Sequence, residues 1–333
     1  MVKEVFPRIF QLKIPLPKNP MNHLNAYLIT GKNRVVLVDT GLNSDESFDG
    51  LKKELEKVGF KLKDITDVWL THFHIDHVGL ILRLRKNSNF RLIIHKNEAE
   101  RSKKVLSNLK EFLSSLKFFL KINGAPKNFI KNLDNFYYSF VNPSIYREIA
   151  NPWLALTGGE KLSLDKYCFK VIWTPGHSAG HICFYEPNFK FLLSGDHLLP
   201  TTTPNVSRFT EDTNPLAEYL DSLEKVEKLD VKKVFPAHED VFINYRERIQ
   251  QLKSHHQQRS KEILEKLQEE KLTAYQLASK IQWETDYESW EKFPFFDKYL
   301  AFGEILAHLK LLEEKNLVKK IRKNQVFFYH AKD

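Results

Sequence analysis

The sequence predicts an α/β protein with layered sheets, followed by a small C-terminal module of helices and a hairpin. Short runs rich in Val, Ile, Leu, Phe and Trp alternate with segments of helical spacing. Several of the short runs end in a polar residue that Gly or Pro follows. Such alternation is typical of an α/β or layered mixed architecture. From about residue 257 onward, the pattern changes to three helices and a basic hairpin.

The chain is long enough for one large domain or two modest ones. It has 333 residues, of which 42% are hydrophobic and only 12 are Gly. This composition excludes a disordered, collagen-like or low-complexity protein. The formal net charge of +9 favours acidic partners such as nucleic acid or anionic metabolites.

Residues 1–250 are predicted to form the α/β body as one domain. A hairpin turn is expected at 186–188, where Glu-Pro-Asn separates two strand-like runs. A mainly helical insert is expected at about 96–150. The strands are predicted at 34–39, 67–70, 90–95, 168–173, 181–185, 190–193 and 233–235, and the helices of the body at 47–58 and 215–229.

Residues 251–333 are predicted to form a winged-helix-like domain. Basic residues gather on its last helix and hairpin, where winged helices contact phosphates. Yet residues 250–333 carry 15 Lys and Arg against 13 Asp and Glu, a net of +2, which is too balanced for a dedicated DNA-binding domain. Packing beside the body or dimerisation is therefore the favoured role. Its helices are predicted at 259–270, 273–280 and 297–315, and its strands at 317–321 and 325–329.

Three histidines and an aspartate fall within six residues, directly after a predicted strand. The run is His72-Phe73-His74-Ile75-Asp76-His77. Alternate side chains of an extended segment point the same way, so His72 and His74 can bind one ion. Asp76 and His77 lie in the turn that follows and can reach a second ion. Imidazole and carboxylate ligands suit zinc, with manganese or iron as alternatives.

One loop has too few ligands for two metals, so further ligands are expected at other strand ends. His177 follows one predicted strand, Asp196 a second and His238 a third. A lone His after a strand is more often structural, but these three residues accompany the first run. Asp39, in Val-Asp-Thr-Gly, is a candidate for orienting the ligand loop without binding a metal.

With these residues, the sequence resembles the metallo-β-lactamase-fold hydrolase superfamily over about residues 8–245. The resemblance implies an αββα sandwich, with two mixed sheets face to face and helices outside. It also implies a metal site in the loops at one edge of the sandwich. The implied ligands are His72, His74 and His177 for the first metal, Asp76, His77 and His238 for the second, and Asp196 for both.

This ligand set implies a hydrolase with two divalent metal ions, most simply zinc. Two ions roughly 3.5–4 Å apart would share a hydroxide, lower its pKa and polarise the oxygen of the scissile group. By the same resemblance, Asp76 would also orient the nucleophile or accept a proton. The bond attacked would belong to a thioester, lactone, amide or phosphodiester.

The resemblance leaves three hypotheses for the function. The body looks like glyoxalase-II-type thioesterases, whereas the tail resembles the lactamase-β-2-like subgroup, some of whose members cleave single-stranded RNA. We expect a thioester or related small acyl or lactone substrate first. An endoribonuclease acting on single-stranded RNA is the alternative, and a non-enzymatic DNA-binding regulator comes third.

The insert carries 10 Lys and Arg against 5 Asp and Glu, a net of +5. Aromatic residues at helical spacing are usually core residues. The alternative is a lid over the metal edge, apolar inside and basic at its rim, which suits a small anionic substrate. Aromatic residues beside Lys could also stack on single-stranded RNA and neutralise it, but a helical lid is an unusual place for such a surface. The aromatic residues of the insert are Phe112, Phe118, Phe119, Phe129, Phe136, Tyr137, Tyr138, Phe140 and Tyr146.

Cys168 and Cys183 are the only cysteines, and both stand in apolar, strand-like runs. Buried free thiols are expected, as suits a reducing cytosol. The start of the sequence lacks a signal-peptide-like stretch, and no 18 apolar residues occur in a row. A cytoplasmic protein without membrane association is therefore expected, and a homodimer is left open.

Overall fold

The computed structural model describes residues 3–140 and 142–332, and their side chains except those of 138–140, which include Tyr138 and Phe140. The described chain forms two compact units. The first comprises residues up to 107 together with 142–204 and 222–248. The second comprises 108–140, 205–221 and 249–332. The predicted domain boundary at residue 250 stays a prediction. The two units have a different outline, because parts of the insert and of the region after residue 204 belong to the second unit.

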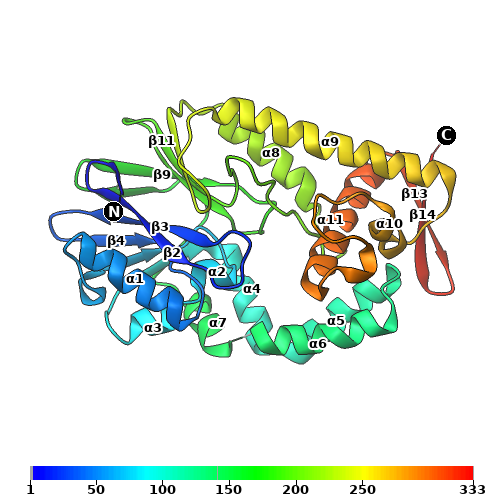
Figure 1. Cartoon of the computed structure of the whole chain (residues 1–333), viewed down its shortest axis with the longest axis horizontal. Coiled ribbons are helices and arrows are strands. Elements are labelled where there is room, and N and C mark those ends of the chain that lie inside the picture. Colours follow the sequence, from blue (N-terminus) through cyan, green and yellow to red (C-terminus); the bar gives the residue numbers. More distant parts are fainter. Residues whose placement is uncertain (1–2, 141, 333) are drawn as a thin grey trace. The chain divides into compact units, whose positions relative to one another are not determined.

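A seven-stranded mixed sheet forms half of the first unit (Figure 1). Its strands follow one another in chain order; β1 to β4 are antiparallel, and β4 to β7 are parallel. The bounds are β1 Lys3–Phe6, β2 Ile9–Pro15, β3 His23–Thr30, β4 Val35–Val38, β5 Asp67–Trp69, β6 Arg91–His95 and β7 Leu154–Leu156.

A five-stranded sheet forms the other half, in the order β12-β11-β10-β9-β8. Strands β8 to β11 are antiparallel, and β12 is parallel to β11. Residues 187–190 form the turn between β10 and β11, which confirms the predicted hairpin. The bounds are β8 Lys161–Leu164, β9 Tyr167–Trp173, β10 Ile182–Glu186, β11 Phe191–Gly195 and β12 Lys233–Pro236.

The two sheets pack face to face through alternate residues of their strands. The Trp69 ring lies 5.5 Å from that of Phe169 and 5.2 Å from that of Phe184, which stand on the opposite sheet. The intervening residues of the seven-stranded sheet, such as Leu37 and Val68, point to its opposite face. There they form a separate core with α1, α3 and α7. These contacts confirm the predicted sandwich of two mixed sheets. The helices of this unit include α1 Asp45–Lys57, α2 Ile75–Val78, α3 Ile81–Arg85, α4 Lys96–Ser107 and α7 Pro143–Ala150, with a short 3₁₀ helix at Leu62–Asp64.

The second unit is mainly helical and closes with a two-stranded sheet. Phe119 and Phe129 of the insert pack in one core with Phe302, Leu306 and other residues of the C-terminal region. Phe118 is 58% exposed and does not join that core. The elements are α5 Leu109–Ile122, α6 Lys127–Phe140, α10 Ala274–Lys280, a 3₁₀ helix at Trp290–Lys292, α11 Phe295–Glu314, β13 Val318–Lys323 and β14 Val326–Ala331.

Two helices contribute residues to both units, namely α8 Pro215–Glu227 and α9 Tyr245–Glu269. We predicted that the second of these helices begins at Arg259, which is wrong by 14 residues. Its sequence contains neither Gly nor Pro, so nothing in it interrupts a helix. The prediction of a winged helix stays a prediction.

Two further expectations are tested by burial and helix length. Cys183 is a buried free thiol as expected, but Cys168 is only partly buried. Its side chain lies on β9, where the strand alternates between buried and exposed positions.

Among the described helices, none has the length and apolar character needed to cross a membrane.

Candidate metal centre

The predicted ligands come from segments that follow four strands of the first unit, and Asp39 follows a fifth strand. Parallel β4 and β5 end at the same edge of their sheet, before the loops of Asp39 and His72. Strands β9 and β11 both run antiparallel to β10, and β12 is parallel to β11. Their carboxyl ends therefore share one edge, where His177, Asp196 and His238 follow.

The first group of ligand atoms comes from His72, His74, His177 and Asp196. His74 is in extended conformation, with φ −114° and ψ 153°. Its Nδ1 lies 2.9 Å from the Nε2 of His72 and 2.9 Å from the Nε2 of His177. The Oδ2 of Asp196 lies 3.4 Å from the same nitrogen of His177. Three imidazoles from two separate loops therefore face one point.

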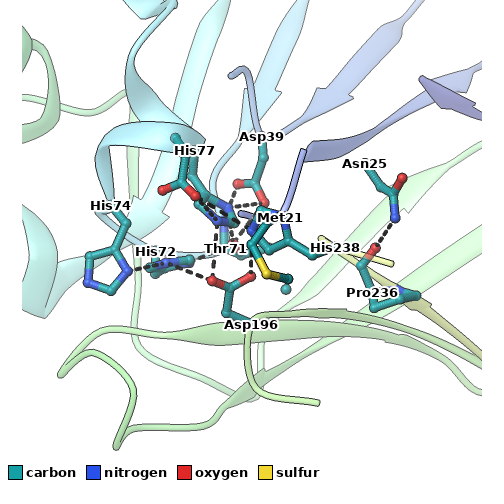
Figure 2. Close-up of polar contacts among 12 residues, drawn as sticks. Met21, Asn25, Asp39, Thr71, His72, His74, His77, Asp196, Pro236 and His238 are labelled. Carbon is teal, nitrogen blue, oxygen red and sulfur yellow. Dashed lines mark hydrogen bonds and ion pairs between the residues drawn. The ribbon is translucent and has the colours of Figure 1, made fainter. Parts of the chain in front are cut away.

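The second group comes from Asp76, His77 and His238. The Oδ2 of Asp76 lies 3.5 Å from His238 Nε2 and 3.9 Å from His77 Nε2. Asp196 lies between the two groups: its Oδ2 is 3.5 Å from His77 Nε2, and its Oδ1 is 3.5 Å from His238 Nε2. Figure 2 shows His72, His77 and His238 around this carboxylate.

The charge states of His72, His74 and Asp196 suit cation binding, whereas that of His77 does not. Burial, with the neighbouring imidazoles, lowers the pKa of His72 and of His74 well below the usual value, so both rings are neutral and keep a lone pair. Burial alone would raise the pKa of Asp196, but His77 and His238 lower it well below the usual range. This carboxylate therefore stays ionised. Burial would lower the pKa of His77, but Asp196, Asp39 and Asp76 raise it well above the usual value, so this ring would have to release a proton when a metal binds.

Asp39 connects the two halves of the ligand loop, as the sequence predicts for an orienting residue. Its Oδ1 accepts from the Thr71 backbone N–H at 2.9 Å, and its Oδ2 accepts from the Thr71 hydroxyl at 2.8 Å. The same oxygen lies 2.9 Å from His77 Nδ1. A proton on Nδ1 directs the other nitrogen of His77 toward Asp76 and Asp196.

His23 and Asn25 hold the loop of His238, and sequence reasoning did not assign them a role. The backbone carbonyl of His23 lies 2.9 Å from His238 Nδ1, which leaves the Nε2 of His238 for the centre. The Asn25 amide donates to the carbonyl of Pro236 at 3.1 Å (Figure 2). It also donates to the carbonyl of Glu239 at 2.6 Å. A backbone carbonyl leaves no signal in the sequence, and a lone Asn leaves little.

His181 supports the loop of Asp196. Its Nε2 accepts from the Asp196 backbone N–H at 3.1 Å, and its Nδ1 lies 2.8 Å from the hydroxyl of Thr174. The ring approaches Gly195 so closely that a Cβ there would lie 2.6 Å from Nε2. The adjacent His197 is also buried, and burial lowers its pKa to about 3.

The donor set fits two divalent cations. In tetrahedral zinc sites with Zn–N distances of 2.0–2.1 Å, the nitrogens are separated by about 3.3 Å, close to the spacing around His74. Among the described residues, the buried His77 Nε2 and Asp196 Oδ1 have no hydrogen-bond partner. Buried polar atoms without partners are rare and costly, and a shared cation would satisfy both. Metal binding by these residues remains a proposal.

Residues 22–238 match the family described as the metallo-beta-lactamase superfamily. The matched segment makes up more than half of the chain and contains all seven predicted ligands. The chain belongs to the metallo-beta-lactamase superfamily. It is therefore a metal-dependent hydrolase, in agreement with the sequence prediction.

Known relatives support this membership along the whole chain. The chain is 25% identical to "Probable metallo-hydrolase YqjP" of Bacillus subtilis (strain 168), over 96% of the chain and 97% of that protein. It is also similar to the crystal structure of a metallo-beta-lactamase family protein from Thermus thermophilus. That similarity has a TM-score of 0.80 and 29% identity, and covers 98% of this chain and 100% of the other.

A third relative carries a more specific name. The chain is 31% identical to "Atrochrysone carboxyl ACP thioesterase" of Aspergillus fumigatus, over 73% of the chain and 59% of that protein. The shared part of the chain therefore corresponds to less than two thirds of the fungal protein.

Proposed function

We propose that this chain uses two divalent metal ions to hydrolyse a thioester or a related small acyl or lactone substrate. The observation that carries the proposal is the convergence of seven ligand side chains in two groups, with Asp196 between them. A single structural histidine cluster would not require two carboxylates at its centre.

Each ligand has a defined part in this proposal. The first ion would be held by the histidines of the first group and the second ion by the second group, with Asp196 shared. Divalent ions supply Lewis acidity and lower the pKa of water at such sites. The Asp76 side chain is 18% exposed, whereas those of His72 and His77 are fully buried. Asp76 can therefore reach a substrate, orient the attacking water and accept its proton.

Zinc is the proposed metal because the site combines neutral imidazoles with carboxylates. Zinc binds such ligands in four-coordinate sites, and the first group offers four ligand atoms. Iron and manganese accept the same donors and are the alternatives.

The proposal of a small anionic acyl substrate rests on charge and on one relative. Arg101, exposed on α4, adds to the effects that lower the pKa of the buried His74, so its positive charge acts at the first group. An anionic carrier beside the scissile bond would benefit from this charge. The fungal thioesterase relative supports a thioester as the bond that is cleaved.

The C-terminal helices give little support for nucleic-acid reading. In winged-helix and related proteins a helix lies in the major groove and exposes one face to it. The α11 helix instead buries Phe302, Ile305, Leu306 and eight other residues, several of them in the core of the second unit. A DNA-binding regulator is not retained, because the chain is a metal-dependent hydrolase.

The substrate class is tested with a panel of acyl-CoA, S-acyl-glutathione, lactones and single-stranded RNA. We expect hydrolysis of at least one thioester or lactone, and loss of that activity in Asp76→Ala. Asp49→Ala is the matched control, since this aspartate is exposed on α1 and pairs with Lys52. Cleavage of RNA alone, lost in Asp76→Ala, would show that the enzyme is a ribonuclease and that the proposed substrate class is wrong.

A further inference from the structure

The loop that carries His177 is held by the first turn of α4. The Oε1 of Glu98 accepts from the Ser178 hydroxyl at 2.7 Å and from the Gly180 backbone N–H at 2.9 Å. The neighbouring Asn97 donates from its amide to the carbonyl of Ala179 at 3.1 Å. Three consecutive residues after His177 are thus fixed by two consecutive residues of one helix.

The contact between Glu98 and the loop is close and buried. Glu98 is only 1% exposed, and its Oε1 accepts both hydrogen bonds, whereas its buried Oε2 has no hydrogen-bond partner among the described residues. Burying a carboxylate is costly, so the two bonds to Oε1 are the contacts that offset this cost. A Cβ at Gly180 would lie 2.6 Å from the Cγ of Glu98, so the backbone approaches the side chain directly. The indole of Trp173 donates to the same Ala179 carbonyl at 3.1 Å, so this carbonyl accepts hydrogen bonds from both Asn97 and Trp173.

We infer that Glu98, assisted by Asn97, is a positioning residue for His177, an inference that rests on the proposed function. Both of the bonds to Glu98 Oε1 go to the loop and not to a ligand side chain. His177 reaches the first group from this loop, whereas the second group comes from other segments. Loss of the Glu98 contacts therefore weakens the first metal selectively.

The experiment measures metal retention in the full-length protein against a competing chelator. We expect the wild type to hold two metals per chain. In Glu98→Ala, one of the two metals should be lost at a chelator concentration about 10- to 100-fold lower than in the wild type, because residues that orient a metal ligand typically change metal affinity by this factor. The other metal should be lost as in the wild type. Glu98→Gln keeps an acceptor oxygen without the charge and should retain both metals nearly as the wild type does.

Glu100→Ala is the matched control, because it removes an exposed carboxylate from the same helix. Ser178→Ala removes one of the two bonds and should show a smaller, equally selective loss, which tests the inference even if Glu98→Ala does not fold. The inference would be overturned if Ser178→Ala and any folded Glu98→Ala retained both metals as firmly as the wild type does. It would also be overturned if these variants lost both metals to the same extent. An equal loss in Glu98→Gln and Glu98→Ala would also overturn it. A wild type that binds no metal would instead refute the proposed function itself.

Discussion

Both units of the molecule bury histidines and carboxylates, but they arrange them differently. In the first unit, imidazoles from separate loops face a shared carboxylate, that of Asp196. In the second unit, His256 Nδ1 lies 3.4 Å from His308 Nε2, and His308 Nδ1 lies 2.9 Å from the hydroxyl of Ser260. These three residues stand on α9 and α11, and no carboxylate lies between the rings in these contacts.

The difference shows that burial alone does not mark a metal site. Burial is the largest effect that lowers the pKa of His72 in the first unit and of His308 in the second, so both rings are neutral. In the described part of the chain, only side chains of the first unit converge in groups that could hold an ion. Convergence on the ionised carboxylate of Asp196 is therefore the distinguishing feature.

The strongest test of the comparison is to replace one buried carboxylate of the first unit by an amide. Asp196→Asn removes the negative charge between the two groups and places an N–H donor where only acceptors fit. We expect kcat/KM for the best substrate to fall by at least about 10³-fold, because both metals lose a ligand. A loss of less than tenfold in a folded variant would contradict the shared role of Asp196.

The matching replacement in the second unit, Glu304→Gln, should affect stability and not activity. Burial raises the pKa of Glu304 to about 7, although the nearby Arg259 opposes this. The folded state then holds a proton that the unfolded state loses, so stability falls as pH rises from about 4.5 to about 7. Above about pH 7, this effect lowers the free energy of unfolding by about 3 kcal/mol.

We therefore expect Glu304→Gln to be more stable than the wild type at pH 8, by about 3 kcal/mol, with a smaller gain at pH 5.5. Urea unfolding at the two pH values measures both gains, and hydrolysis rates check that activity is unchanged. A gain that is the same at both pH values would show that Glu304 does not titrate in this range. A loss of activity would contradict the expectation that Glu304 affects stability alone.

The smallest expected effect concerns Arg101 at the edge of the first group. Arg101→Ala should raise KM for an anionic thioester by about three- to fivefold, the range of an exposed ion pair. The kcat and the metal content should not change. Lys103→Ala, on the same helix and equally exposed, is the control. An equal rise in KM for an uncharged thioester would show that Arg101 does not act through its charge.

The strand ends and their polar residues were predictable because both signals are local. The run from His72 to His77 places four candidate ligands within six residues, and each later ligand follows an apolar run. The strands β1 to β3 were not predicted. β7 and β8 were not predicted either. In β2 and β3, the polar residues Gln11 and Asn25 interrupt the apolar runs by which strands are recognised, although both residues are buried.

Apart from Asp39, the supporting residues could not be predicted, because their contacts join distant parts of the chain. Glu98 holds a loop 80 residues away, and the carbonyl of His23 meets a ring 215 residues away. Likewise, the aromatic residues of the insert are compatible with any core. Periodicity shows that Phe119 and Phe129 are buried, but not that they pack with the C-terminal helices.

The most direct measurement is the metal content per chain of the wild type, Asp196→Asn and Glu304→Gln, by elemental analysis after dialysis. The convergent arrangement predicts two metals in the wild type and in Glu304→Gln, and fewer than one in Asp196→Asn. Fewer than one metal in the wild type, or equal contents in all three proteins, would contradict the assignment of a dinuclear centre to the first unit.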